Sequence, residues 1–146
     1  MGLGAFPANN KLFLGMLGMH GTYQANMSMH NADLILAVGA RFDDRITNTP
    51  ALFAPNAKIV HIDVDPASIS KIINADIPIV GQVKESLQAL IKEIKRSKIK
   101  IDSDAIEDWI GKINIWKDKH GLDHEIYMKH LKTKAILPQA VVQELY

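Results

Sequence analysis

The sequence predicts an α/β protein built on a parallel β-sheet, and three observations support this. Short apolar or β-branched runs expected to form strands alternate with segments of helical character, and the connections between them are short. The first run, Leu34–Val38, is apolar throughout, which is typical of a parallel strand covered on both faces. Glycines follow the expected strands at Gly39 and Gly81, as in the ligand-binding turns of such sheets. Strand–helix–strand order of this kind favours right-handed crossovers.

Composition excludes several classes of protein. The chain has 146 residues, of which 47% are hydrophobic and 23% charged, so a globular domain is expected. A net charge of +1 gives no electrostatic indication of nucleic acid or an anionic membrane as partner. Cysteine is absent, which rules out disulfides and thiolate chemistry. Without an apolar run of about 20 residues or a signal-peptide pattern, a cytoplasmic protein is expected.

The first half of the chain contains two expected helical segments and a second strand. Thr22 is a plausible N-cap for a helix from Tyr23 to about His30, because its hydroxyl can accept a free backbone N–H. Ala51–Ala54 is expected to form a short helical turn. Lys58–Ile62 is expected to form the second strand.

Beyond that strand, the pattern predicts a helix, a strand and a longer helix. Asp65 as N-cap with Pro66 at the first helical position predicts a helix over Ala67–Ile73. Ile77–Val80 is expected to form the third strand. Apolar residues at helical spacing predict an amphipathic helix over Val83–Lys95.

A change of composition at Ser97–Ile101 is the best candidate for a domain boundary, which divides the chain into 1–101 and 102–146. After it, Ser103 is expected to cap a long amphipathic helix that runs to about Lys119 and ends at Gly121. Pro138 is expected to open a last helix.

Two groups of residues follow the expected turns and are candidates for ligand binding. Gly15, Gly18 and Gly21 precede a helix, where close approach to a diphosphate and tight packing are about equally plausible readings. Asp63 and Asp65 follow the second strand. If Asp65 is used as an N-cap, Asp63 is the better candidate for accepting hydrogen bonds from a ribose; the alternative is that both only form a turn.

The charged run after Gly39 has three interpretations. Arg41, Asp43, Asp44 and Arg45 could be a surface ion-pair cluster, the commonest fate of such residues. Their place at the carboxyl end of a strand favours ligand binding instead. Mg²⁺ is the weakest option, because adjacent carboxylates seldom point the same way.

Histidines and methionines offer weaker signals. His61 lies mid-strand and is expected to be a hydrogen-bonded core residue. His120 and His124 flank Gly121, which spoils zinc geometry. No serine or cysteine elbow supports a nucleophile. The methionines are expected to fill the core, namely Met16, Met19, Met27 and Met29.

Several segments together resemble one enzyme family. They are MGLGAFP, LGMLGMHGTYQANMSMHNADLILAVGARFDDR, HIDVDPASISKIINADIPIVG and ILPQAVVQELY. In this order and spacing they resemble the catalytic large subunits of acetolactate synthase, also called acetohydroxyacid synthase. The RFDDR motif resembles the biosynthetic, FAD-containing type. The resemblance covers essentially the whole chain.

The resemblance implies a fold and a domain assignment. Residues 1–101 would be the later part of a central FAD-binding domain, a partial Rossmann-like, three-layer α/β/α parallel sheet. Residues 102–146 would be a helical connector and the first helix of a C-terminal domain that binds thiamine diphosphate. The thiamine diphosphate and Mg²⁺ sites of such enzymes would lie outside this segment, and it would supply neither a catalytic residue nor a metal ligand.

The resemblance also implies site residues. Met19, His20, Asp44 and Arg45 would face the substrate channel. Gln82 departs from the acidic residue often found at that place in the family. The FAD-binding residues would be Met1, Gly2, Leu3, Leu17, Gly18, Met19, His20, Gly39, Ala40, Arg41, Asp43, Arg45, Ile46, Asp63, Val64, Ser68, Gly81 and Gln82.

The implied reaction converts two pyruvates, or pyruvate and 2-oxobutyrate, to an acetohydroxyacid and CO₂ in branched-chain amino acid biosynthesis. A homo-oligomer of catalytic subunits with a small regulatory subunit is implied as well. We expect the chain alone to be catalytically silent, to bind FAD weakly and to associate through exposed sheet edges. The alternatives are another thiamine diphosphate carboligase, such as glyoxylate carboligase, and a non-catalytic flavin- or nucleotide-binding fragment.

Overall fold

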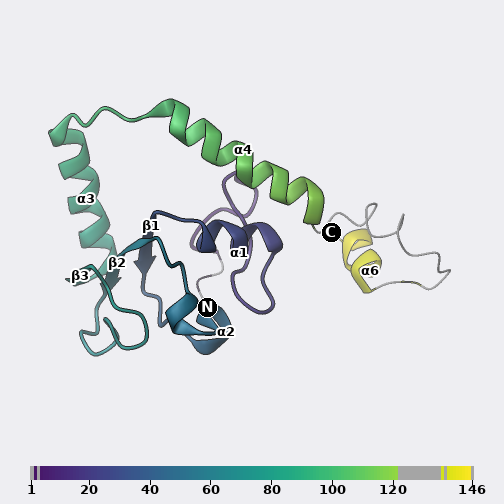
Figure 1. Ribbon diagram of the computed structural model, residues 1–146, viewed down its shortest axis with the longest axis horizontal. Helices are drawn as coiled ribbons and strands as arrows, with labels where there is room; N and C mark the ends of the chain where they lie inside the picture. The colour runs from purple at the N-terminus through teal and green to yellow at the C-terminus, as the bar shows by residue number, and fades with distance from the viewer. Residues whose placement is uncertain (1, 3, 122–135, 137, 146) are drawn as a thin grey trace.

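A three-stranded parallel sheet lies at the centre of the computed structural model, which describes residues 2, 4–121, 136 and 138–145 (Figure 1). The strands are β1 (Leu34–Val38), β2 (Lys58–Asp63) and β3 (Ile77–Val80), in the order β1-β2-β3. Both pairings are parallel, and Val38 is paired with Ile62. The predicted α/β class and all three strands are confirmed, with β2 one residue longer than expected.

Helices connect and flank these strands. Thr22 caps the first as predicted: its Oγ accepts from the N–H of Ala25 at 3.3 Å and donates to the carbonyl of Leu14 at 2.6 Å. The helix of four residues that follows β1 was not predicted. The helical elements are α1 (Tyr23–His30), α2 (Asp44–Thr47), the 3₁₀ turn η1 (Pro50–Leu52), α3 (Val83–Ser97), α4 (Ser103–His120) and α6 (Pro138–Glu144).

The main hydrophobic cluster lies on the sheet face that carries Ile35, Ala37 and Ile59. It is built from inward-facing strand residues and from the loops that follow them, which pack against half-buried residues such as Met29 and Phe53. Ile62 is completely buried on the opposite face of β2, because successive side chains of a strand alternate between faces. The core residues are Ile35, Ala37, Phe42, Ala54, Ile59 and Ile73.

The expectation that β1 is covered on both faces is wrong for the described residues. Leu34, Leu36 and Val38 are 58%, 42% and 38% exposed, whereas the alternate positions are buried. An unbroken apolar run indicates that both faces of the strand favour burial, but it does not identify the element that covers each face. Here only one face of β1 packs against other described parts of the chain.

The helix predicted over Ala67–Ile73 is also wrong, because this segment consists of turns. Asp65 does cap its start, accepting the N–H of Ala67 at 2.9 Å. The turn does not propagate, since Ser70 adopts a φ of +58°, which a right-handed helix excludes. The Ser70 hydroxyl then accepts the N–H of Ala75 at 3.0 Å and directs the chain into β3.

The long helix α4 begins one residue earlier in its capping than predicted. Asp102, not Ser103, is the N-cap, and its Oδ1 accepts the N–H of Ala105 at 3.0 Å. The helix ends before Gly121 as expected and runs alongside α1 (Figure 1). His120 stacks on Tyr23 with ring centroids 4.1 Å apart.

Among the described residues, no helix combines the length and apolar character needed to cross a bilayer.

Candidate functional site

Three turns meet at the carboxyl edge of the sheet. The N–H of Gly39, after β1, donates to the carbonyl of Ile62 at 2.8 Å. The N–H of Gly81, after β3, donates to the carbonyl of Asp63 at 2.9 Å. Gly39 has a φ of +59°, and a Cβ built on it would meet no atom within 4 Å. Backbone at this edge is therefore open to close approach by a ligand.

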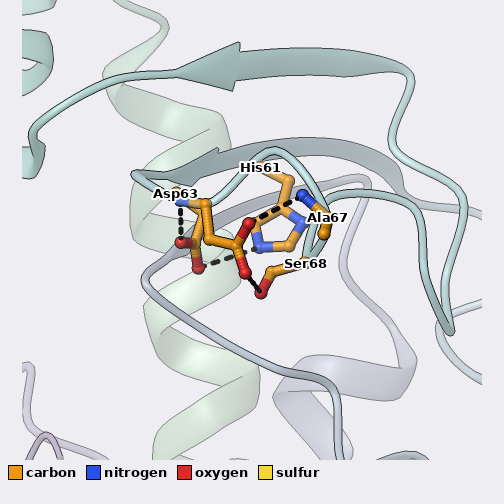
Figure 2. A network of polar contacts seen from close by, with 5 residues as sticks. His61, Asp63, Ala67 and Ser68 are labelled. Carbon is orange, nitrogen blue, oxygen red and sulfur yellow. Dashed lines mark hydrogen bonds and ion pairs between the residues drawn. The ribbon is translucent and has the colours of Figure 1, made fainter.

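The turn after β2 organises two carboxylates differently (Figure 2). Asp65 is used locally, because its oxygens accept from the N–H of Ala67 at 2.9 Å and the hydroxyl of Ser68 at 3.2 Å. Oδ1 of Asp63 accepts the N–H of Asp65 at 2.9 Å. Oδ2 of Asp63 has no hydrogen-bond donor within the described residues, so it retains the capacity to accept one.

His61 lies directly behind this turn and is completely buried (Figure 2). Its Nε2 is 4.0 Å from Oδ2 of Asp63, too far for a hydrogen bond. The ring of Phe42 contacts it edge-on, with centroids 5.1 Å apart. Within the described part of the chain neither ring nitrogen has a partner. His61 is thus a core residue as predicted, and the hydrogen bond expected for it does not occur among the described residues.

A second cluster joins the glycine segment to α2. The N–H of Met19 donates to the carbonyl of Arg45 at 2.8 Å. Gly18 has a φ of +100°, and a Cβ built on it would lie 2.4 Å from the carbonyl oxygen of Arg45. Only glycine allows these loops to come so close. The hollow beside them has a volume of about 310 Å³ and is lined by Gly18, Met19, Asn26, Asp44, Arg45, Ile46 and Asn48.

In the part of the chain that the structure describes, the charged side chains here pair with near neighbours in sequence. Arg41 contacts Asp43 at 2.9 Å, and Arg45 lies 3.7 Å from Asp44. All four side chains are about half exposed or more. Exposed pairs of this kind contribute about 0–1 kcal/mol, so a ligand can displace them at little cost. No group of three or more histidine, aspartate or glutamate side chains able to hold a metal occurs among the described residues.

The predicted site residues therefore fall into two groups with a loop between them. The hollow brings together Gly18, Met19, Asp44, Arg45 and Ile46. The sheet edge brings together Gly39, Asp63 and Gly81, with Val64, Ser68 and Gln82 adjacent in the chain. Arg41 and Asp63 do not line the hollow.

The remaining predicted residues lie around these groups. His20 is exposed, whereas Leu17 and Ala40 are half-buried. Gly2 lies in the exposed first turn; Met1 and Leu3 are outside the described residues, as is His124. The expectation that the methionines fill the core is wrong for Met16 and Met19, which are 60% and 65% exposed. Larger hollows beside α4 contain none of the predicted residues.

Asn26 is a residue of the hollow that the sequence did not reveal. Its side chain leaves α1 and forms two hydrogen bonds with Gly18. Asparagine is unfavourable inside a helix, which is the one signal that could have indicated a special role. The partner of such a side chain cannot be read from sequence spacing.

Comparison with known proteins places the chain in a family. Residues 1–90 match the family model of the thiamine pyrophosphate enzyme, central domain. The chain belongs to this family. The open sheet edge described above is thus part of the central domain of a thiamine pyrophosphate enzyme.

Curated relatives of this thiamine pyrophosphate enzyme segment are acetolactate synthase large subunits. The isozyme 3 large subunit of Escherichia coli is 49% identical over 146 residues, which are 100% of this chain and 25% of that protein. The large subunit of Haemophilus influenzae is 47% identical over 147 residues, covering 100% of this chain and 24% of that protein. A probable large subunit of Methanococcus aeolicus is 42% identical over 150 residues, covering 99% and 24%. The chain thus spans about a quarter of the length of these relatives.

Proposed function

We propose that this chain is the part of an acetolactate synthase catalytic subunit that binds FAD and lines the substrate channel. The observation that carries the proposal is the convergence of Gly39, Asp63 and Gly81 at one sheet edge. Similarity to large subunits over essentially the whole chain supports the same assignment. The alternative carboligase is not favoured by these relatives.

The residues at the sheet edge fit a dinucleotide. Open backbone at Gly39 suits the close approach of a diphosphate. The uncommitted Oδ2 of Asp63 suits a ribose hydroxyl, because a carboxylate accepts two or more hydrogen bonds and only Oδ1 is engaged locally. FAD is proposed as a structural element, with no net redox in the reaction.

The channel is proposed at the hollow beside Gly18. Met19 presents an exposed, flexible apolar side chain there, and Asp44 and Arg45 present exposed charges. His20, next to Met19, is exposed as well. An exposed guanidinium can pair with the carboxylate of a 2-oxo acid such as pyruvate.

The whole enzyme is proposed to join the two-carbon unit left by decarboxylation of pyruvate to a second pyruvate or to 2-oxobutyrate. Thiamine diphosphate with Mg²⁺ supplies the carbanion chemistry, and the protein supplies binding and orientation. Its sites are assigned to parts of the subunit other than this chain. A homo-oligomer of catalytic subunits with a small regulatory subunit belongs to the same proposal.

The flavin assignment is tested at Asp63. In a flavin-fluorescence titration of the purified chain, Asp63→Asn is expected to lower FAD affinity about tenfold, because it removes a charge-assisted hydrogen bond. Asp33→Asn, an exposed carboxylate at the opposite end of β1, is the control and is expected to bind like the parent. Equal affinities for both variants would exclude Asp63 as a ligand, and a parent chain that binds no flavin would contradict the proposal.

A further inference from the structure

One side chain of α1 holds both backbone groups of Gly18. Oδ1 of Asn26 accepts the N–H of Gly18 at 2.8 Å, and Nδ2 of Asn26 donates to the carbonyl of Gly18 at 2.9 Å. The same carbonyl accepts the N–H of Gly21 at 2.9 Å, so both of its lone pairs are used. The peptide groups of Gly18 are therefore fixed relative to α1, and not only to their chain neighbours.

Gly18 transmits this constraint to the opposite wall of the hollow. A Cβ built on Gly18 would lie 2.4 Å from the carbonyl oxygen of Arg45 and 3.0 Å from Cα of Ile46, so the two backbones are in direct contact. The N–H of Met19 then donates to that carbonyl at 2.8 Å. A continuous series of contacts thus runs from Asn26 through Gly18 and Met19 to Arg45.

The helix that carries Asn26 is itself anchored. Thr22 donates to the carbonyl of Leu14 at 2.6 Å, and Nε2 of Gln24 donates to the same carbonyl at 3.3 Å. Ala25 is buried, and α1 packs along α4. Because the helix is held at its start and along its side, the position of Asn26 is fixed. Asn26 can therefore restrain the backbone of Gly18, which as glycine has wide conformational freedom.

We propose that Asn26 is the positioning residue of the hollow: by fixing Gly18, it sets where the Met19 wall lies relative to the Arg45 wall. Asn26 acts through Gly18 and Arg45. The expected effect of Asn26 on ligand binding rests on the proposed function. The claim that Asn26 fixes the position of Gly18 rests only on the hydrogen bonds between them. A purely structural role would stabilise α1 without changing the loop contact or the binding site.

Asn26→Asp is the informative substitution. It preserves the size of the side chain and the acceptor for the N–H of Gly18, but it removes the donor and places a carboxylate against the Gly18 carbonyl. By amide hydrogen exchange, Met19 is expected to exchange about tenfold faster, since loss of the donor leaves the loop contact unsupported. The N–H of Lys58, which donates to Asp33 at 2.8 Å, is the internal reference and is expected to keep its rate.

The ligand-binding consequence is measured on the same proteins. The hollow shares Gly18, Met19, Arg45 and Ile46 with the residues proposed to bind FAD. FAD affinity of the Asn26→Asp variant is therefore expected to fall about tenfold at neutral pH. Below about pH 4 a carboxyl group of ordinary pKa takes up a proton and regains one O–H donor. The ratio of variant to parent, in both exchange and affinity, is therefore expected to return toward one on acidification.

Asn31→Asp is the matched control. Asn31 follows the same helix, and its Nδ2 donates to the carbonyl of Met27 at 2.8 Å, but it is exposed and does not line the hollow beside Gly18. This variant makes the same chemical change and is expected to leave Met19 exchange and FAD affinity unchanged.

The outcomes separate the inference from the flavin assignment. Parent-like Met19 exchange in Asn26→Asp overturns the inference, as does faster exchange with unchanged FAD affinity, because the role would then be structural only. If the parent binds no flavin, the flavin assignment fails, and the inference is decided by the exchange rates and their recovery at acid pH.

Discussion

Gly18→Ala is expected to lower the free energy of unfolding by about 3 kcal/mol, measured by urea denaturation. Two costs combine at this position. A φ of +100° strains any residue with a Cβ, and the added atom would lie 2.4 Å from the carbonyl oxygen of Arg45. Backbone strain contributes about 1–3 kcal/mol and overpacking a similar amount. The neighbouring backbone cannot move aside cheaply, because Met19 is hydrogen-bonded to the same carbonyl.

Gly39→Ala is the control for this prediction. Gly39 also has a positive φ, of +59°, but a Cβ there would meet nothing within 4 Å. Only the left-handed conformation then opposes alanine, at about 1 kcal/mol. If the two variants lost the same stability, the close contact between Gly18 and Arg45 would be contradicted.

Adjacent substitutions on β2 are expected to change stability in opposite directions. Ile62→Ala is expected to lower the free energy of unfolding by about 3 kcal/mol, because Ile62 is completely buried and alanine leaves a cavity. His61→Leu is expected to raise it by about 1 kcal/mol, because both buried ring nitrogens lack partners in the described part of the chain. This value of about 1 kcal/mol is the net gain after the lost aromatic contact with Phe42, which costs about 0.5–1.5 kcal/mol, is subtracted.

Urea midpoints of the two variants, with equal slopes of free energy against denaturant, measure this difference of about 4 kcal/mol. His61→Ala is the second comparison, since it removes the same nitrogens but creates a cavity, and is expected to be less stable than His61→Leu. A clear loss of stability in His61→Leu would show that the imidazole forms a hydrogen bond.

The strands and the helix that precedes the sheet could be predicted from the sequence because their signals are local. Leu34–Val38 and Ile77–Val80 are bounded by turn residues, and Thr22 caps α1 through atoms three residues away. The same local signal misled at Asp65 and Pro66, where a valid cap begins a turn. Ser70 adopts a positive φ there and bonds Ala75, and a sequence pattern does not report that choice.

For the candidate site, too, some features could be predicted from the sequence and others could not. Glycines after strands and an acidic turn predicted where ligands approach, since the carboxyl ends of parallel strands lie at one edge. The sequence did not show that Arg41 and Asp63 lie outside the hollow that Gly18 and Arg45 share. Family resemblance, rather than composition or spacing, identified the flavin and substrate-channel residues, and their roles remain predictions.

By itself, the sequence determined a parallel α/β sheet, the places where its turns carry glycine and charge, and membership of a recognisable enzyme family. Only the tertiary structure decided that Asn26 holds Gly18 against Arg45. It also decided that, among the described residues, one face of β1 is exposed and the buried His61 has no partner. The physical reason is the sequence separation of the interacting residues. Caps and turns depend on near neighbours in the chain, whereas these contacts depend on how separate elements pack.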